Sequence, residues 1–566
     1  MSALGSFLIK QIGKRAAKRF EAATQDPLAA QQRKLMEIVE RNKDTEYGRE
    51  YDFASIDSLD DYRAKVPLIT YEEIKERMDR VVGGDKNVLT AEDPVMFAQT
   101  SGTTGDAKYV PVTPTCQGRD HSDQMRTWTY HAMSTHPRML RGQAVTLVSP
   151  AVEGHTPSGI PFGSASGHIY RNMPGIVRST YAVPYEVFLI EDYEAKYYAL
   201  MRVAIASDVT FVGTANPSSI VKMSEFADNH ADSLLKDLAE GTLHREIEIK
   251  PDLRQAIEAS LKKDPAKARR LEQAREKRSG RLLPADYWPD LALIGCWKGG
   301  TVGSYIEKFP EWFDPDRRGM VPVRDWGYLS SEARGSIPLS DHGSAGVLTV
   351  NANVFEFVPV DEIEGHSDDP GSWSFRGVDE LEEDQEYYIF LTTTGGLYRY
   401  DINDVIKVVG RYNNTPTIVF QRKGRGMTNI TGEKLSVNQI IVAFEKVSVK
   451  MGVAIDHFKA EADQQGSRYV FKVEARALPA QRRRELLEGI DRELSGLNIE
   501  WEAKRKSQRL RAPVLNVMKE GWYDRQKQAL VADGKRLFQA KTVLLDAKEG
   551  HTEDPENLEA LVTLEE

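Results

Sequence analysis

A loop rich in glycine and hydroxyl side chains interrupts two apolar runs in PVMFAQTSGTTGDAKYVPVT, residues 94–113. The flanking runs, PVMFAQ and YVPVT, have the composition of short β-strands, so we expect the loop at the end of a sheet, where ligands commonly bind. Glycines let the backbone approach a ligand closely, hydroxyls donate hydrogen bonds, and a lysine adds one positive charge. A phosphate group suits this chemistry, and the candidate phosphate ligands are Thr100, Ser101, Gly102, Thr103, Thr104, Gly105 and Lys108.

The loop does not match the Walker P-loop. Counting from Gly102, Ala107 stands where that motif requires its second glycine, and Tyr109 stands where it requires a hydroxyl for magnesium. Taken alone, a loop of this composition is also typical of a solvent-exposed β-turn. Both interpretations stay open on the loop residues alone.

A carboxylate beside hydroxyl groups follows in WGYLSSEARGSIPL, residues 326–339, where the candidate residues are Tyr328, Ser330, Ser331 and Glu332. Magnesium prefers oxygen ligands and keeps several of its waters, so a single carboxylate among hydroxyls is a suitable site for it. The alternative is the capped start of a helix, in which serine and glutamate side chains accept hydrogen bonds from the first backbone N–H groups.

Two further acids, Asp401 and Asp404, lie at a predicted strand turn in LYRYDINDVIKVVGR, residues 397–411. A carboxylate in this position can accept hydrogen bonds from both hydroxyls of a ribose, as acidic residues do in other nucleotide sites. A turn-forming aspartate is the alternative interpretation.

The hydrophobic pattern around these segments predicts an α/β fold. Strand-like runs alternate with a helical span near 117–135, and a highly charged helical layer is expected over 217–278; the strands are predicted at 144–150, 209–214, 291–297, 346–360, 386–400 and 404–423. The stretch QRKGRGMTNITGEK lacks apolar periodicity and resembles a linker. We therefore predict a large multi-sheet α/β domain over 1–424, a hinge linker over 425–434 and a smaller α+β domain over 435–566.

Length and composition indicate a multidomain enzyme. The chain has 566 residues and a formal net charge of -10, which argues against nucleic acid as its main partner. Its two cysteines, Cys116 and Cys296, exclude a disulfide framework and favour a reducing, cytoplasmic location. Residues 1–23 predict an amphipathic helix without an apolar run of transmembrane length; we expect it to pack on the main domain, with contact to a membrane surface as the alternative.

Together, the three candidate segments resemble the auxin-responsive acyl-acid amido synthetases of plants and their bacterial relatives, within the acyl-adenylate-forming superfamily. QTSGTTGDAK is similar to the family's phosphate loop, YLSSE to its Tyr-x-Ser-Ser-Glu motif, and LYRYDINDVI to its Leu-Tyr-Arg-Tyr-Arg-x-Gly-Asp-Val-Val motif. The segments TPSGIP, GTVGSYI and FEFVP are similar to further family segments in the same order. The resemblance covers nearly the whole chain and implies a large adenylate-forming domain, which binds ATP and the acyl acid, followed by a small mobile domain.

The resemblance also implies roles for the candidate residues. The loop from Ser101 to Lys108 would hold the phosphates of ATP, with Lys108 facing the charge on the departing pyrophosphate. Tyr328 would pack on the adenine, and Ser331 would reach the α-phosphate. Glu332 would hold Mg²⁺.

In the third motif, Asp404 aligns with the family's ribose-binding aspartate, whereas Asp401 replaces an arginine and Asn403 replaces a glycine. These two departures concern the local turn and a charge partner. In the linker, basic positions of the family's hinge are matched by Arg422, Lys423 and Lys434. Lys541 is similar to a C-terminal lysine that domain rotation brings to the site.

The implied activity is an ATP-dependent ligation of a small carboxylic acid to an amine, with an amino acid as the amine, through acyl-AMP and pyrophosphate. Transfer to a thiol such as coenzyme A and a catalytically idle nucleotide-binding relative are the rival interpretations. The acid pocket is expected beside Met125 and Arg126, Thr156 to Ile160, and Phe355 to Phe357. Arg126 is either a partner for a second substrate carboxylate or an exposed helix residue. The acid and the oligomeric state, a monomer included, stay open.

Overall fold

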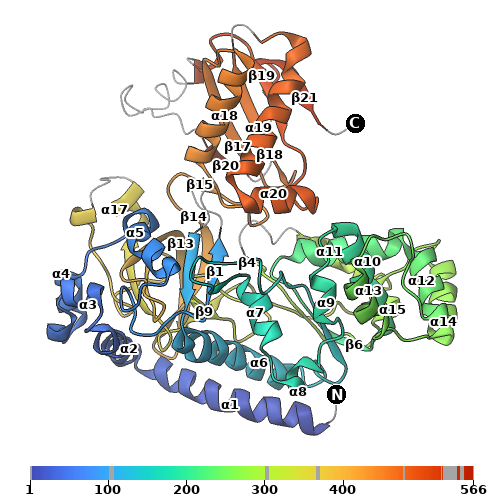
Figure 1. Cartoon of the computed structure of the whole chain (residues 1–566), viewed down its shortest axis with the longest axis horizontal. Helices are drawn as coiled ribbons and strands as arrows, with labels where there is room; N and C mark the ends of the chain where they lie inside the picture. The colour runs from blue at the N-terminus through green and yellow to red at the C-terminus, as the bar shows by residue number, and fades with distance from the viewer. Residues whose placement is uncertain are drawn as a thin grey trace. The chain divides into compact units, whose positions relative to one another are not determined.

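The computed structural model describes residues 3–100, 108–299, 305–364, 370–475, 478–523, 525–526, 545–548 and 554–564. The chain forms two compact units (Figure 1). The larger unit comprises residues 1–99 and 109–421, and the smaller unit comprises residues 100–108 and 422–566. Each unit has its own hydrophobic core.

A parallel sheet lies in the larger unit, with the strand order β3-β6-β7-β8. Its strands are β3 (Gln143–Thr146), β6 (Val209–Gly213), β7 (Leu293–Gly295) and β8 (Val323–Arg324). The connections between parallel strands must cross the sheet, and here they carry helices. Between β3 and β6 these are α7 (Ala165–Arg171), α8 (Gly175–Arg178), α9 (Tyr185–Phe188) and α10 (Tyr193–Ala206).

The charged segment between β6 and β7 is helical, as its sequence predicts. It forms α11 (Pro217–Asn229), α12 (Ala231–Glu240), α13 (Pro251–Glu258), α14 (Pro265–Lys277) and α15 (Pro284–Tyr287). Proline begins four of these helices, at a position where the backbone N–H has no partner within the helix. Their buried leucines join the core around α10, so the charges form the outer face.

Two further sheets complete the larger unit. The strand order of the antiparallel sheet is β11-β12-β13-β14-β10-β9, and that of the smaller sheet is β2-β1-β5-β4. The strands of the first are β9 (Ser336–Ile337), β10 (Gly346–Leu348), β11 (Val354–Pro359), β12 (Glu386–Thr392), β13 (Tyr400–Tyr412) and β14 (Thr415–Lys423). Those of the second are β1 (Met96–Thr100), β2 (Lys108–Val112), β4 (Gly154–His155) and β5 (Pro161–Gly163).

The N-terminal helix α1 (Ala3–Gln25) packs along α6 (Asp123–Thr135), as expected for a helix of the main domain (Figure 1). Gly13 permits the close approach, because a Cβ there would lie 2.9 Å from the carbonyl oxygen of Arg126. The π-helical segment η2 (Cys116–Ser122) leads into α6.

The other helices of the larger unit are α2 (Pro27–Asn42), α3 (Glu46–Glu50), α4 (Leu59–Lys65), α5 (Tyr71–Gly83), α16 (Phe309–Phe313) and α17 (Val360–Glu364). Among the helices of the described residues, none has the length and apolar character needed to cross a membrane.

The smaller unit has a five-stranded sheet in the order β20-β17-β18-β19-β21. Its strands are β17 (His457–Asp463), β18 (Arg468–Glu474), β19 (Val514–Met518), β20 (Leu545–Lys548) and β21 (Leu558–Thr563). Its helices are α18 (Val437–Met451), α19 (Arg483–Leu497) and α20 (Ile499–Lys506). This is the α+β composition that the sequence predicts after the linker.

The linker sequence itself contains a short antiparallel pair, β15 (Met427–Thr428) with β16 (Leu435–Ser436). Glu433 anchors the pair, since its carboxylate accepts hydrogen bonds from the backbone N–H of Ile430 at 2.6 Å and from the hydroxyl of Tyr469 at 2.6 Å. Residues 427–436 are therefore a packed part of the smaller unit, and they overlap most of the segment predicted as a hinge linker.

Candidate active site

A direct contact joins two of the predicted site residues, which are 76 positions apart in the chain. The hydroxyl of Tyr328 donates a hydrogen bond to Asp404 Oδ2 at 2.6 Å, and both side chains are buried. Burial and the neighbouring Asp404 raise the pKa of Tyr328 well above its usual range, so the phenol stays protonated and remains a donor. The Tyr328 ring also lies parallel to Phe420, with the ring centroids 6.1 Å apart.

An irregularity in β13 sets the position of Asp404. Ile389 of β12 pairs with Asp404, whereas the next residue, Phe390, pairs with Asp401, so two residues of β13 bulge out of the ladder. Asn403 in this bulge has a φ of +56°, and its backbone N–H donates to Asp401 Oδ1 at 2.8 Å. Asparagine tolerates this left-handed conformation better than most residues. The change from the family's glycine at this position therefore preserves the turn.

Glu332 lies in a tight turn that the sequence motif forms. The N–H of Ser330 donates to the carbonyl of Ala333 at 2.9 Å, the N–H of Ala333 donates to Ser330 Oγ at 3.1 Å, and Leu329 bridges Arg334. The capped helix start that the motif also allowed is therefore wrong, because the chain reverses direction as a hairpin. Ser330 holds the turn, and Ser331 and Glu332 occupy its tip.

Besides burial, the carboxylates of Glu332 and Asp404 both raise the pKa of two buried tyrosines, Tyr328 and Tyr400. The Glu332 carboxylate contributes to the raised pKa of Tyr328, and after burial it is the largest cause of the raised pKa of Tyr400. Asp401 and Asp404 also raise the pKa of Tyr400. Three carboxylates therefore add negative potential around the buried Tyr400. Among the described residues, however, no three acidic, histidine or cysteine side chains lie close enough together to ligate one metal ion.

The structure describes the predicted phosphate loop only at its two ends. Thr100 ends β1 and the half-buried Lys108 begins β2, so the predicted strands on both sides are confirmed. Residues 101–107, which include Ser101, Gly102, Thr103, Thr104 and Gly105, lie outside the described residues.

The basic residues predicted in and beyond the linker belong to the smaller unit. Arg422 and Lys423 end β14, where Arg422 is exposed and Lys423 is half-buried. Lys434, also half-buried, has a φ of +48° just before β16. Lys541 lies outside the described residues.

The segments expected around the acid pocket have different surroundings. Arg126 is half-exposed and its Nη1 lies 2.9 Å from Asp123 Oδ1, so it is a solvent-facing helix residue. Thr156 Oγ1 accepts the backbone N–H of Ile160 at 3.1 Å and closes a local turn. Phe355 and Phe357 are buried in the main core, because β11 is covered on both faces.

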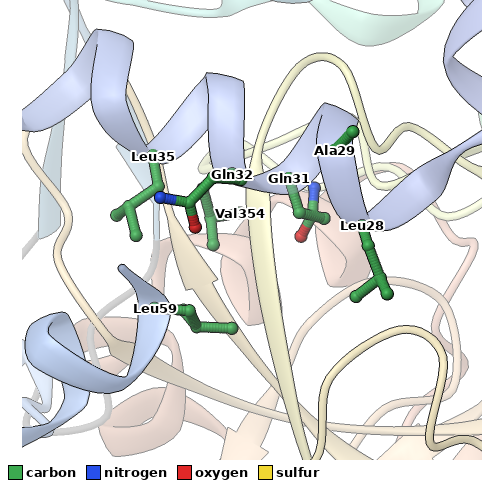
Figure 2. A pocket seen from close by; sticks show the side chains of 7 residues that line it. All are labelled: Leu28, Ala29, Gln31, Gln32, Leu35, Leu59 and Val354. Atoms are coloured by element: carbon green, nitrogen blue, oxygen red, sulfur yellow. The ribbon is translucent and has the colours of Figure 1, made fainter. Parts of the chain in front are cut away.

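Figure 2 shows a hollow of about 270 Å³ beside α2, lined by Leu28, Ala29, Gln31, Gln32, Leu35, Leu59 and Val354. Its lining carries no charged or nucleophilic group. Gln31 is occupied by the main chain, since its amide nitrogen donates to the carbonyl oxygens of Val350 and Asn353 at 2.8 and 2.7 Å. This hollow therefore lacks the groups needed for catalysis.

Sequence reasoning missed a polar face of the helix that contains Met125 and Arg126. Burial and the nearby charge of Arg334 lower the pKa of His121 to about 4, so its imidazole is neutral at pH 7. Gln124 Nε2 donates to Asn351 Oδ1 at 3.4 Å, and Trp128 Nε1 donates to the carbonyl of Asp325 at 2.8 Å. Gln124 and Trp128 are four positions apart, so they share one face of α6, and this spacing was the available signal. His121 lies in the π-helical segment before α6, where that spacing does not apply.

Comparisons with known proteins identify the family of the chain. The GH3 family N-terminal domain matches residues 16–317, the GH3 family central domain matches residues 346–423, and the GH3 family C-terminal domain matches residues 438–549.

Among curated relatives, a probable indole-3-acetic acid-amido synthetase GH3.1 of Oryza sativa subsp. japonica is 26% identical over 93% of this chain and 88% of its own. Indole-3-acetic acid-amido synthetase GH3.6 of Arabidopsis thaliana is 27% identical over 71% of this chain and 68% of its own. The solved structure of the AtGH3.15 acyl acid amido synthetase in complex with 2,4-DB has the same fold, with a TM-score of 0.65, 19% identity and 98% coverage of both chains. Because the N-terminal family model alone spans more than half of the sequence, the chain belongs to the GH3 family.

Proposed function

We propose that this protein is an ATP-dependent acid–amine ligase, which activates a carboxylic acid as its adenylate and transfers the acyl group to the amine of an amino acid. The observation that carries the proposal is the buried group of Tyr328, Glu332 and Asp404, which two separate family motifs contribute. Curated relatives named as indole-3-acetic acid-amido synthetases support the same reaction class.

Activation is needed because the oxygen of a free carboxylate is a poor leaving group. In the first step, a carboxylate oxygen of the acid attacks the α-phosphorus of ATP, and pyrophosphate leaves. In the second step, the amine nitrogen attacks the carbonyl carbon of the mixed anhydride, AMP leaves with the bridging oxygen, and the nitrogen loses a proton. The first step requires stabilisation of charge, and the second requires mainly positioning and exclusion of water.

The buried group is suited to bind the nucleotide. Asp404 can accept hydrogen bonds from the ribose hydroxyls, and its bond from Tyr328 fixes the carboxylate before ATP arrives. The adenine would pack beside the Tyr328 ring. The phosphate-loop residues from Thr100 to Gly105 and Lys108 would bind the triphosphate, with Ser331 directed to the α-phosphate.

A single carboxylate is enough for Mg²⁺, which retains several waters and also binds substrate phosphates. Glu332 would hold the ion, and Asp401 and Asp404 add to the negative potential around Tyr400. When bound, the ion supplies positive charge that offsets the charge of the triphosphate.

Rotation of the small domain about the linker would allow the site to change between the two steps. Pyrophosphate must leave and an amine must enter, which a rotating small domain can permit. Residues 427–436 are anchored within the smaller unit, so they would move with it. The pivot would therefore lie in the chain just before them, which contains Arg422, Lys423 and Gly426. Gly426 has a φ of +63°, a conformation that favours glycine. Lys541 would reach the site after this rotation.

Acid-dependent exchange of labelled pyrophosphate into ATP tests the proposal, with a panel of carboxylic acids and with product masses measured after addition of amino acids, simple amines or coenzyme A. We expect exchange that requires both an acid and Mg²⁺, and a product equal in mass to acid plus amino acid minus water. Exchange without an acid, or a thioester as the sole product, would contradict it.

A further inference from the structure

A buried arginine beside the proposed nucleotide site differs from the other buried arginines. In the part of the chain that the structure describes, four arginines are buried: Arg202, Arg324, Arg334 and Arg399. A buried charge is costly unless it is paired or fully hydrogen-bonded. The partners of each guanidinium therefore indicate its role.

Three of the four are held by the protein itself. Arg202 donates to three carbonyl oxygens, each at 3.0 Å. Arg399 donates to both oxygens of Glu356 at 3.0 and 3.2 Å, and Arg324 Nε lies 2.6 Å from Asp341 Oδ1. These residues are tied to the fold by strong bonds.

Arg334 is not held in this way, although it is only 3% exposed. It donates one long hydrogen bond, from Nη1 to the carbonyl oxygen of Trp326 at 3.4 Å, and no carboxylate of the described residues pairs with it. Burial lowers the pKa of its guanidinium to about 10, so the group stays charged at neutral pH. The positive charge of Arg334 therefore has no carboxylate partner among the described residues.

Other polar groups near Arg334 also have unused hydrogen-bonding capacity. Gln124 Oε1 is buried without a hydrogen-bond partner among the described residues. Printed contacts place Gln124 near Arg334: its Nε2 donates to Asn351, and the neighbouring Thr349 Oγ1 and Asn353 Nδ2 donate to the carbonyl oxygen of Arg334 at 2.7 and 3.2 Å. Burial and the charge of Arg334 also lower the pKa of the imidazole of the half-buried His121. Native buried polar groups are normally satisfied, so the poorly bonded guanidinium of Arg334 and the unpartnered oxygen of Gln124 together indicate a ligand.

The hairpin at residues 328–335 separates this cluster from the nucleotide side. Leu329 and Arg334 are bridge partners and share one face. Tyr328 lies opposite Gly335 on the other face, where a Cβ on Gly335 would come within 2.3 Å of the Tyr328 ring. Asp404 contacts Tyr328, so Asp404 and the Arg334 side of the hairpin lie on opposite faces.

We propose that Arg334, with His121 and Gln124 beside it, binds a second carboxylate of the acid substrate, so that the preferred acids are dicarboxylic. This inference rests on the proposed function. In the proposed function, the nucleotide binds on the Tyr328 face and Ser331 at the hairpin tip holds its α-phosphate, where the reacting carboxylate must attack. Arg334 lies on the opposite face, so a carboxylate bound by Arg334 is a second one. A guanidinium binds a carboxylate with two parallel hydrogen bonds. The role that the sequence offered to Arg126 passes to Arg334, because Arg126 already pairs with Asp123 at the surface.

The test compares aliphatic and aromatic dicarboxylic acids with their half-amides, in which one carboxylate is replaced by a carboxamide of nearly the same shape. Pyrophosphate exchange is measured for the wild type, Arg334→Met, Arg334→Lys and the control Arg126→Met. The wild type should prefer at least one diacid over its half-amide by tenfold or more in kcat/KM. Arg334→Met should lose that preference through a higher KM for the diacid, with the half-amide changed less than about threefold. Arg334→Lys should keep part of the preference, and Arg126→Met should keep all of it.

Thermal unfolding separates a substrate-binding role from a structural one. Arg334→Met should melt at or above the wild-type temperature, because it removes a buried charge without an anion, whereas Arg202→Met should melt lower. The preferred diacid should raise the melting temperature of the wild type but not that of Arg334→Met.

Three results would overturn the inference: no preference for any diacid in the wild type, equal loss of diacid and half-amide activity in Arg334→Met, or a melting temperature unaffected by every diacid. If no acid supports exchange but a diacid still stabilises the wild type through Arg334, the proposed ligase function fails and the anion site stands.

Discussion

Replacing Asp404 by alanine should raise the KM for ATP and leave kcat nearly unchanged, because ribose hydroxyls are held alike in the ground state and the transition state. Asp404 is 3% exposed, and its Oδ2 already accepts the Tyr328 hydroxyl at 2.6 Å. A hydrogen bond to a charged group in such a setting contributes about 1.5–3 kcal/mol. Loss of one ribose bond should therefore raise the KM for ATP roughly 10- to 100-fold.

The assay is acid-dependent pyrophosphate exchange, measured as a function of ATP concentration at saturating acid and Mg²⁺. Asp401→Asn is the matched control, because it removes a nearby charge but keeps an oxygen that can accept the Asn403 N–H. Its KM should change less than about threefold. Tyr328→Phe should raise the KM less than Asp404→Ala does, and should add little to it in the double variant, because the Tyr328 hydroxyl acts through Asp404.

A folded Asp404→Ala protein with the wild-type KM for ATP would refute this assignment. A fall in kcat at unchanged KM would also refute it, since Asp404 would then contribute to the transition state alone.

Three other predictions concern charge, protonation and motion. Lys108→Ala and Glu332→Gln should each slow pyrophosphate exchange about a hundredfold or more, with the fold retained in circular dichroism; a wild-type rate in either variant would exclude that residue. The folded-state pKa of His121 lies near 4, below its unfolded value, so the unfolded chain binds the proton first as the pH falls. The free energy of unfolding should therefore drop by about 2 kcal/mol more in the wild type than in His121→Gln between pH 7 and pH 5, and equal drops in urea titrations would contradict a neutral buried imidazole. Gly426→Ala should slow amide formation from the bound adenylate more than pyrophosphate exchange, whereas Gly452→Ala, at a similar φ of +60° in the smaller unit, should affect neither step beyond a loss of stability; matching effects of both variants would count against a pivot at Gly426.

Much of the fold could be predicted from local sequence patterns. The apolar runs beside the phosphate loop are β1 and β2, and the charged segment with prolines at 251 and 265 is helical. Asn403, which stands where the family motif has glycine, has a φ of +56°, a conformation that both glycine and asparagine adopt readily.

The remaining features depend on contacts between distant residues, which a single sequence does not contain. The Ser-Ser-Glu segment matches the pattern of a helix start. In the structure, the bonds between Ser330 and Ala333, and the bond from the Gly335 N–H to the Tyr328 carbonyl, form a hairpin instead. Of the two interpretations of Arg126, the exposed helix residue is the one that the structure supports, because Arg126 pairs with Asp123 at the surface. The residue that is buried, Arg334, comes from a segment more than two hundred residues away in the chain. The linker composition predicts a hinge over 425–434, but not the bonds by which Glu433 ties part of this segment to Tyr469 of the smaller unit.

Transfer of an oxygen isotope from the acid to AMP tests the central claim most directly. The acid is labelled with ¹⁸O in its carboxylate and incubated with ATP, Mg²⁺, an amino acid and the wild-type protein, and the nucleotide and phosphate products are analysed by mass spectrometry. If the carboxylate attacks the α-phosphorus and the amine then displaces AMP, each AMP should carry one ¹⁸O and the pyrophosphate none. AMP without the label, or ADP together with labelled phosphate, would contradict ligation through an acyl-adenylate.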